Sequence, residues 1–136
     1  MSTRDLSIKS IRLDSISDAI KSEMSSEEYF QNSVLRPIIK FQNDLLIAAF
    51  LNFCSTYKNV FFELSAENKI SYIENAVVKD RTFRNSLKDM IVGLFTIEEY
   101  TIYSANASAL NKRIIGIVKE RLISHVQLLS EMGPTA

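Results

Sequence analysis

An uninterrupted apolar run from Leu45 to Leu51, followed by Phe53 and Cys54, constrains this chain more than any other segment. Seven residues are too few to cross a bilayer, because a membrane helix needs about 20 apolar residues. Wound as an α-helix, the run is apolar around nearly its whole circumference, and such a helix is normally surrounded by other elements. The run therefore predicts the central helix of a bundle, over residues 36–56, since Pro37 fits a first helical turn.

Amphipathic segments that could pack around this helix lie on both sides of it in the sequence. Apolar residues spaced three and four apart predict helices over 66–79, 83–94 and 107–131, and shorter helices are expected over 26–34 and 97–104. Ser65 and Thr82 are candidate caps, 59–64 is expected to be a loop whose Phe side chains plug the bundle end, and a break near Asn106 stays open. With no convincing strand pair, we predict an all-α fold, a compact multi-helix bundle around the central helix with a long C-terminal helix.

Two of these helices are expected to begin with the same local device. Ser25 with Glu28, and Thr96 with Glu99, stand three residues apart, as the two halves of a capping box do. An apolar pair flanks each box at the positions of a hydrophobic staple, Met24 with Tyr29 and Phe95 with Tyr100. We interpret the shared Glu-Glu-Tyr as two helices that start for the same physical reason, not as a functional repeat.

The first 24 residues differ from the rest in the spacing of their apolar residues. Leu13, Ile16 and Ile20 fit one helical face, whereas Leu6 with Ile8 fits a strand better, so the period is mixed. We expect an N-terminal arm over 1–24, loosely attached or docked on a partner and helical when docked. A single helical bundle domain over 25–132 and a tail over 133–136 would follow, since 136 residues fit one domain.

Charge and composition exclude several classes of function. The 16 Lys and Arg balance the 16 Asp and Glu, so no excess positive charge is present to bind nucleic-acid phosphates. One Cys and one His exclude an internal disulfide and multi-Cys or multi-His metal centres. The N-terminus lacks the apolar stretch of a secretory signal. We therefore expect a cytoplasmic protein that binds no nucleic acid and no membrane.

No motif that carries catalysis is found. Gly93, Gly116 and Gly133 are too far apart for a phosphate-binding loop, and His125 lacks the Glu three residues earlier that di-iron bundles use. Two adjacent acid pairs lie in first helical turns, where acids complement the helix dipole: Glu27 with Glu28 and Glu98 with Glu99. We assign no catalytic residue, no metal ligand and no cofactor.

A cluster of cations is the one positive feature. Arg81, Arg84 and Lys88 stand three and four apart and so share a helix face, which the start of the last long helix could meet. The candidate contacts for an anion, a phosphate-bearing ligand or an acidic patch of a partner are Arg81, Arg84, Lys88, Asn111, Lys112 and Arg113. The alternative, which we weigh more heavily, is a solvated face paired to nearby acids.

Five segments carry a resemblance to a known family: LRPIIKFQNDL (35–45), YIENA (72–76), FRNSL (83–87), GLFT (93–96) and ALNKR (109–113). Over roughly residues 25–128 the chain resembles a family of small helical proteins of Bacteroidetes bacteria, some of which carry the label glyoxalase. The resemblance implies a bacterial helical protein and, through that label, a glyoxalase activity. It implies no particular catalytic residue.

Three functions are weighed on these observations. The first is a small cytosolic helical interaction or regulatory protein that self-associates, or binds a protein partner, through an apolar stripe left exposed. The alternative is a helical bundle that binds a small anionic or apolar ligand between its helices. The third, disfavoured, is the glyoxalase-type enzyme that the family label implies. Such enzymes hold a metal with His and Glu ligands, and one His cannot complete a multi-His set.

Overall fold

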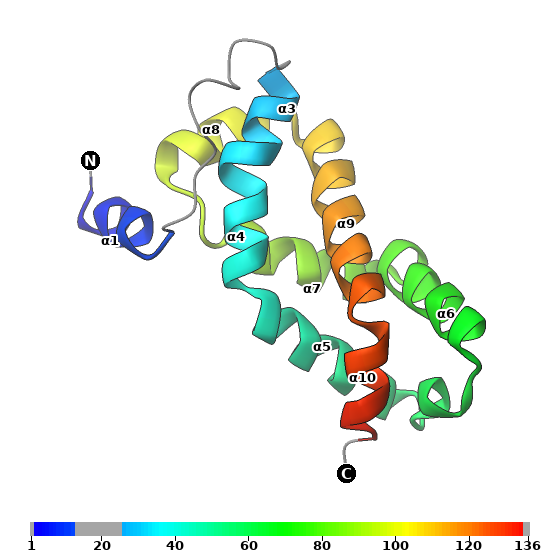
Figure 1. Ribbon diagram of the computed structural model, residues 1–136. Coiled ribbons are helices and arrows are strands. Elements are labelled where there is room, and N and C mark those ends of the chain that lie inside the picture. Colours follow the sequence, from blue (N-terminus) through cyan, green and yellow to red (C-terminus); the bar gives the residue numbers. More distant parts are fainter. Residues whose placement is uncertain (1, 13–25, 135–136) are drawn as a thin grey trace. The chain divides into compact units, whose positions relative to one another are not determined.

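The computed structural model describes residues 2–12 and 26–134, and every regular element within these ranges is a helix (Figure 1). The predicted all-α class is therefore confirmed. By its internal contacts the chain divides into two units: unit 1 is Met1–Gln42 with Lys88–Ile114, and unit 2 is Asn43–Leu87 with Ile115–Ala136. Two helices, α7 (Arg81–Val92) and α9 (Ala107–Ser124), supply residues to both units.

Unit 1 contains α1 (Thr3–Ile11), α3 (Ser26–Phe30), a π-helical turn (Gln31–Leu35), α4 (Arg36–Phe41) and α8 (Ile97–Ala105). The end of α7 and the start of α9 complete it. Its core is formed by buried side chains from all of these elements: Ile8, Phe30, Leu35, Ile38, Ile39, Ile91, Phe95, Tyr103, Leu110 and Ile114. Burial of these apolar surfaces is the main term that stabilises the unit.

Residues of the expected arm form α1, which resolves the mixed periodicity in favour of a helix over this stretch. The Ser2 hydroxyl accepts the Asp5 backbone N–H at 3.1 Å and so caps the helix. Residues 13–25 lie outside the described ranges, and with them the proposed capping box at Ser25, its staple partner Met24 and the boundary of the arm. The division into arm, domain and tail stays a prediction.

The prediction that one helix ends at 34 and a second runs over 36–56 is wrong in its boundaries. The chain is helical without interruption from Ser26 to Phe41, and the break falls at Gln42. Pro37 has no N–H to donate to the preceding turn, and a π-helical turn before it, in which the Arg36 N–H reaches the Gln31 carbonyl, accommodates this loss. A Pro inside a helical run therefore changes the local winding without ending the helix.

Unit 2 contains α5 (Asn43–Thr56), a 3₁₀ turn (Val60–Glu63), α6 (Ala66–Lys79), the start of α7, the end of α9 and α10 (Val126–Met132). An aromatic cluster centred on Phe50 forms much of its core. The ring centroid of Phe50 lies 5.1 Å from that of Phe61, 6.2 Å from that of Tyr72 and 6.5 Å from that of Phe83. The segment expected to be a loop, 59–64, contains the 3₁₀ turn, and its Phe61 is fully buried in the core of this unit.

Helix α5 is not enclosed on all sides, contrary to the prediction from its apolar run. Its inward face is Leu46, Ile47, Phe50, Leu51 and Cys54, whereas Leu45 is 47% exposed. Asp44, Ala48 and Asn52, spaced four apart, are all exposed. Ala48 lies within the run and Asp44 and Asn52 flank it, and together these polar or small residues form a narrow solvent-facing stripe on the helix.

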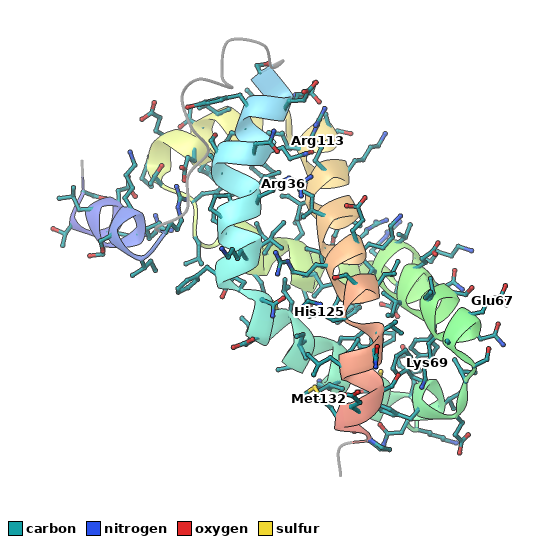
Figure 2. The ribbon with its side chains drawn as sticks, in the orientation of Figure 1. Arg36, Glu67, Lys69, Arg113, His125 and Met132 are labelled. Atoms are coloured by element: carbon teal, nitrogen blue, oxygen red, sulfur yellow. The ribbon has the colours of Figure 1, made fainter. Side chains whose placement is uncertain are left out.

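Two further boundaries differ from expectation. Helix α7 begins at Arg81 because Asp80, not Thr82, caps it: Asp80 Oδ1 accepts the Phe83 backbone N–H at 3.0 Å. The long C-terminal helix is two helices, α9 and α10, separated at His125 (Figure 2). The question left open at Asn106 is resolved as a break before α9, and Gly133, with φ of 72°, ends α10.

Candidate functional site

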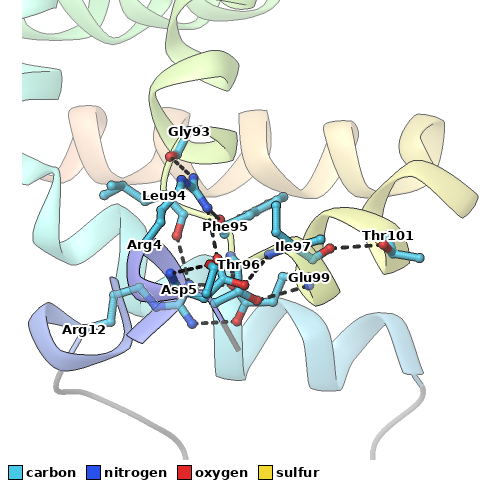
Figure 3. A network of polar contacts seen from close by, with 11 residues as sticks. Arg4, Asp5, Arg12, Gly93, Leu94, Phe95, Thr96, Ile97, Glu99 and Thr101 are labelled. Atoms are coloured by element: carbon cyan, nitrogen blue, oxygen red, sulfur yellow. Dashed lines mark hydrogen bonds and ion pairs between the residues drawn. The ribbon is translucent and has the colours of Figure 1, made fainter. Parts of the chain in front are cut away.

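A network of polar contacts joins α1 to the segment that leads into α8 in unit 1 (Figure 3). Arg12 donates two hydrogen bonds to the Glu99 carboxylate, from Nη1 to Oε1 at 2.6 Å and from Nη2 to Oε2 at 2.5 Å. Arg12 Nη1 also donates to the Leu94 carbonyl at 3.1 Å. The Arg12 and Glu99 side chains are only 8% and 12% exposed. A bidentate and largely buried pair of this kind imposes one geometry on the two segments that it joins.

Arg4 and Asp5 extend the network: Arg4 binds carbonyl groups that precede α8, and Asp5 binds the first N–H of α8. Arg4 donates from Nη1 to the Phe95 carbonyl at 2.8 Å and from Nη2 to the Gly93 carbonyl at 3.0 Å. Asp5 is buried, and its Oδ2 accepts the backbone N–H of Ile97 at 3.1 Å. That N–H is one of the first-turn donors that a helix cannot satisfy internally. Helix α1 therefore supplies partners for backbone groups that α8 and the preceding loop leave open.

Glu99 also completes the capping box that the sequence predicts at Thr96, which is confirmed. The Thr96 N–H donates to Glu99 Oε1 at 2.8 Å, and the Glu99 N–H donates to Thr96 Oγ1 at 3.2 Å. Burial would raise the pKa of Glu99, but the hydrogen bonds from Arg12 and from the Thr96 N–H outweigh it, and the pKa is lowered. Glu99 is thus an ionised carboxylate at neutral pH that joins α1 to α8.

The network decides which side of α8 faces the core of unit 1. Glu99 and Tyr103, four residues apart, point inward, and the Tyr103 ring lies 5.5 Å from that of Phe95. The Tyr100 ring lies 5.9 Å from that of Tyr103, so Tyr103 contacts both residues that were expected to form a staple. Three large apolar side chains are left on the surface of this nine-residue helix: Ile97 at 61%, Tyr100 at 51% and Ile102 at 50% exposure.

A cavity of about 510 Å³ lies beside the ion pair in unit 1 and is lined by residues that include Lys9, Arg12, Ser26 and Ile102. The Nε atom of Arg12 is buried without a hydrogen-bond partner in the described part of the chain. The residues between Arg12 and Ser26 lie outside the described ranges. We therefore assign no ligand to this cavity.

The first three predicted cations all lie on α7. Arg84 donates from Nη1 to the Val78 carbonyl at 3.0 Å. Lys88 pairs with the adjacent Asp89 at 3.6 Å. Arg81 and Arg84 belong to unit 2, whereas Lys88 belongs to unit 1.

The second predicted cluster lies at the start of α9 in unit 1. Asn111 Oδ1 accepts a hydrogen bond from the Tyr103 hydroxyl at 2.5 Å. Arg113, labelled in Figure 2, donates from Nε to Glu27 Oε1 at 3.3 Å and from Nη1 to Gln31 Oε1 at 2.9 Å. Asn111 and Arg113 therefore connect α9 to α8 and to the α3 segment.

Two of the six predicted contacts, Arg81 and Lys112, are exposed, and neither has a polar partner among the described residues. They belong to different units. The idea that all six residues form one anion or partner surface stays a prediction.

Sequence reasoning does not find Arg4, Asp5 and Arg12 as members of this network, because it predicts a loosely attached arm for the segment that holds them. The Thr96–Glu99 box has a local three-residue spacing and could be found. Arg12 is 87 residues from Glu99, and no local spacing reveals that pairing. From the sequence alone, the one signal at Arg12 is its charge next to a helical pattern of apolar residues.

The reactive side chains of unit 2 are not arranged for nucleophilic chemistry. Burial raises the pKa of the Cys54 thiol to about 12, despite a backbone hydrogen bond that lowers it. Burial also raises the pKa of Tyr72, and nearby Cys54 and Tyr57 raise it further. His125 is half-buried at the junction of α9 and α10, with Nδ1 3.2 Å from Ser124 Oγ. Cys54 and Tyr72 are therefore uncharged at neutral pH.

In residues 2–12 and 26–134, no group of three or more His, Cys, Asp or Glu side chains is placed to hold a metal ion. No helix in this part of the chain is both long and apolar enough to cross a membrane. No family model, no curated protein and no solved structure matches the chain. Function is therefore argued from the geometry of the sites, since a fold class alone does not define one.

Proposed function

We propose that this chain is a small helical interaction protein that self-associates through α8. The observation that carries the proposal is the outward orientation of Ile97 and Tyr100, which are 61% and 51% exposed. A surface helix normally buries its apolar face and exposes its polar one. Helix α8 instead turns the Glu99 carboxylate inward and leaves apolar side chains in solvent.

This orientation is held by specific bonds. The Arg12 guanidinium binds Glu99, and Asp5 binds the first N–H of α8. Rotation of α8 to bury Ile97 would break these contacts and would leave Arg12 as a buried charge without its partner. Such a buried charge costs several kcal/mol. The apolar exposure is therefore built into unit 1, and is the kind of feature that marks an interaction surface.

The exposed face of α8 suits a second copy of the same chain. Ile97, Tyr100, Thr101 and Ser104 stand at spacings of three and four, so they share this face, and none is charged. In a two-fold symmetric contact each residue lies near its own counterpart, and charged residues would meet like charges. An uncharged face with a central aromatic avoids that repulsion.

The contact is expected to be weak. Helix α8 has nine residues and is about 14 Å long at 1.5 Å per residue. A stable interface buries about 800 Å² on each partner, more than one short helix offers, so a dissociation constant on the order of 100 µM is expected. Reversible pairing of this strength fits a regulatory role in the cytoplasm, which we also propose.

Sedimentation velocity over protein concentrations from about 10 µM to about 1 mM tests the proposal. The mean mass is expected to rise from the 15.5 kDa monomer toward twice that value. Ile97→Glu and Tyr100→Glu should keep the chain monomeric throughout, because each puts like charges into the contact. Leu128→Glu, at a site with 46% exposure on α10, is the matched control and should dimerise as the wild type does. A constant monomer mass, or loss of pairing only in the control, would reject the α8 contact.

The resemblance to small Bacteroidetes proteins stays a proposal of family membership. If the glyoxalase label described this chain, purified protein would turn over methylglyoxal and lose that activity to a chelator. We expect no turnover, since the single histidine is half-buried beside Ser124. Chelator-sensitive turnover would replace the interaction function as our conclusion.

A further inference from the structure

A groove of about 580 Å³ opens on the surface of unit 2 between the end of α5 and one face of α6. Its volume lies in the range of pockets that hold small molecules. Three aromatic rings, Phe53, Tyr57 and Tyr72, form its walls, and Asn75, Lys79 and Asp80 supply polar groups. The groove is distinct from α8, which belongs to unit 1.

The aromatic walls are held in place but remain accessible. The Phe53 ring centroid lies 4.7 Å from that of Tyr57 and 6.1 Å from that of Tyr72. Tyr57 is 51% exposed, and its hydroxyl donates to Asp80 Oδ2 at 3.4 Å. Rings fixed on one side and open on the other offer flat π surfaces against which a planar ligand can stack.

The face of α6 that lines the groove combines an aromatic end with a cationic end. Tyr72, Ala76 and Lys79 stand four and three residues apart and so share one side of the helix. The small side chain of Ala76 leaves room between the other two. A ligand that stacks on Tyr72 can therefore extend a polar group along α6 toward the Lys79 ammonium.

Positive charge is in excess at the groove, because two cations, Lys79 and Arg84, stand against one acid, Asp80. Asp80 accepts hydrogen bonds from two neutral donors, the Phe83 N–H on Oδ1 and the Tyr57 hydroxyl on Oδ2, so these bonds orient its carboxylate without cancelling its charge. Lys79 is exposed and makes no hydrogen bond or ion pair with the described residues. Arg84 donates to the Val78 carbonyl at the end of α6, which adds a second positive charge within a few residues of Lys79. The electrostatic complement of this site is an anion.

We propose that the groove binds a small planar aromatic anion, with its ring against Tyr57 and Tyr72 and its carboxylate or equivalent acid at Lys79. This inference does not rest on self-association, because it uses neither α8 nor any residue of unit 1. It assigns a ligand class to a groove whose lining contains none of the six contact residues predicted from the sequence.

The test uses the full chain and three probes, followed by amide ¹H–¹⁵N NMR titration. 1-Naphthoate has the ring and the acid, 1-naphthylmethylamine has the ring with a positive charge, and cyclohexanecarboxylate has the acid without the flat ring. Saturable shifts confined to the groove, at Tyr57, Tyr72, Asn75 and Lys79, are expected with naphthoate. The other two probes should bind at least about tenfold more weakly, since each loses one of the two interactions. Equal binding of the amine, or shifts that do not saturate, would overturn the proposal.

Paired variants separate the ring contribution from the charge contribution. Tyr57→Leu should weaken naphthoate binding about tenfold, because stacking on one aromatic side chain is worth about 1–3 kcal/mol. Phe41 is as exposed as Tyr57 but lies in unit 1, so Phe41→Leu should leave the naphthoate affinity unchanged. Lys79→Gln should weaken naphthoate binding yet leave binding of the amine unaltered or tighter, and Lys119→Gln on α9 is its control. Unaltered naphthoate affinity in a folded Lys79→Gln variant, with folding checked by circular dichroism, would rule out the assigned anion contact.

Discussion

Arg12 and Glu99 lie 87 residues apart in the sequence and meet through two nearly parallel hydrogen bonds of 2.6 and 2.5 Å. The same carboxylate accepts the Thr96 N–H, so one side chain completes a helix cap and also binds the end of α1. Formation of the α8 N-terminus and docking of α1 are thereby coupled. The apolar side chains of α8 stay outward as long as this pair is intact.

Removal of Arg12 is expected to be strongly destabilising. Arg12→Ala leaves Glu99 ionised and largely buried without its partner, which should lower the free energy of unfolding by about 3 kcal/mol in urea denaturation at pH 7. Arg12→Lys should recover only part of this, because an ammonium cannot make the bidentate contact. Arg36→Ala removes an exposed hydrogen bond to Asn32 and should cost less than about 0.5 kcal/mol. Comparable losses in both alanine variants would show that the pair has no special role.

Stability should depend on pH through Glu99. Its pKa is lower in the folded chain than in the unfolded one, so its contribution is present above the unfolded pKa of about 4.3 and is lost as pH falls through the folded pKa. Urea denaturation between about pH 7 and pH 3 should show this loss in the wild type. Glu99→Gln should be less stable at pH 7 and decline less steeply below about pH 5. Glu67→Gln, an exposed acid on α6, should keep the wild-type profile; an identical decline in Glu99→Gln would contradict the assignment.

The cap of α7 gives a direct comparison between the residue expected from sequence and the residue observed. Asp80→Ala removes the acceptor of the Phe83 N–H and should cost about 1 kcal/mol. Thr82→Ala, within the first turn of α7, should cost less than about half of that. Urea midpoints of the two variants show which residue caps α7. A larger loss of unfolding free energy for Thr82→Ala than for Asp80→Ala would identify Thr82 as the cap, as the sequence predicts.

Phe61 should be among the most sensitive positions in unit 2. It is fully buried between Phe50 and Tyr72, and the Lys69 ammonium lies 5.6 Å from its ring centroid. Phe61→Ala should therefore lower the free energy of unfolding by about 3–5 kcal/mol. Phe41→Ala, at 51% exposure, should cost less than about 1 kcal/mol, and a similar loss at both sites would argue against the aromatic core.

Cys54 should be protected from thiol reagents in the folded chain. Burial raises the pKa of its thiol to about 12, so almost no thiolate is present at pH 8. Labelling by iodoacetamide, followed by mass spectrometry, should be more than about 100-fold slower in buffer than in concentrated urea, where the pKa returns to about 8.5. Rapid labelling of the native chain would place Cys54 at the surface.

Several elements could be predicted from short-range patterns. Helix α6 has the predicted bounds, because Ser65 caps it and its apolar residues repeat at helical spacing. The Thr96–Glu99 box likewise depends on residues three apart. Two predictions failed because another local arrangement competes with the expected one: a π turn accommodates Pro37, and Asp80 rather than Thr82 lies in position to cap α7. Leu45 belongs to an apolar run, yet its side of α5 also carries polar and small residues and stays exposed.

The sequence by itself determined the all-α class, the bounds of α6 and the Thr96–Glu99 capping box. These follow from side-chain periodicity and residue type, which are local properties. Only the tertiary structure decided that Arg12 meets Glu99, that α8 exposes Ile97 and Tyr100, and that Tyr57, Tyr72 and Lys79 share one groove. Each of these depends on how segments distant in sequence pack, and the free energy of that packing is not encoded in the spacing of neighbouring residues.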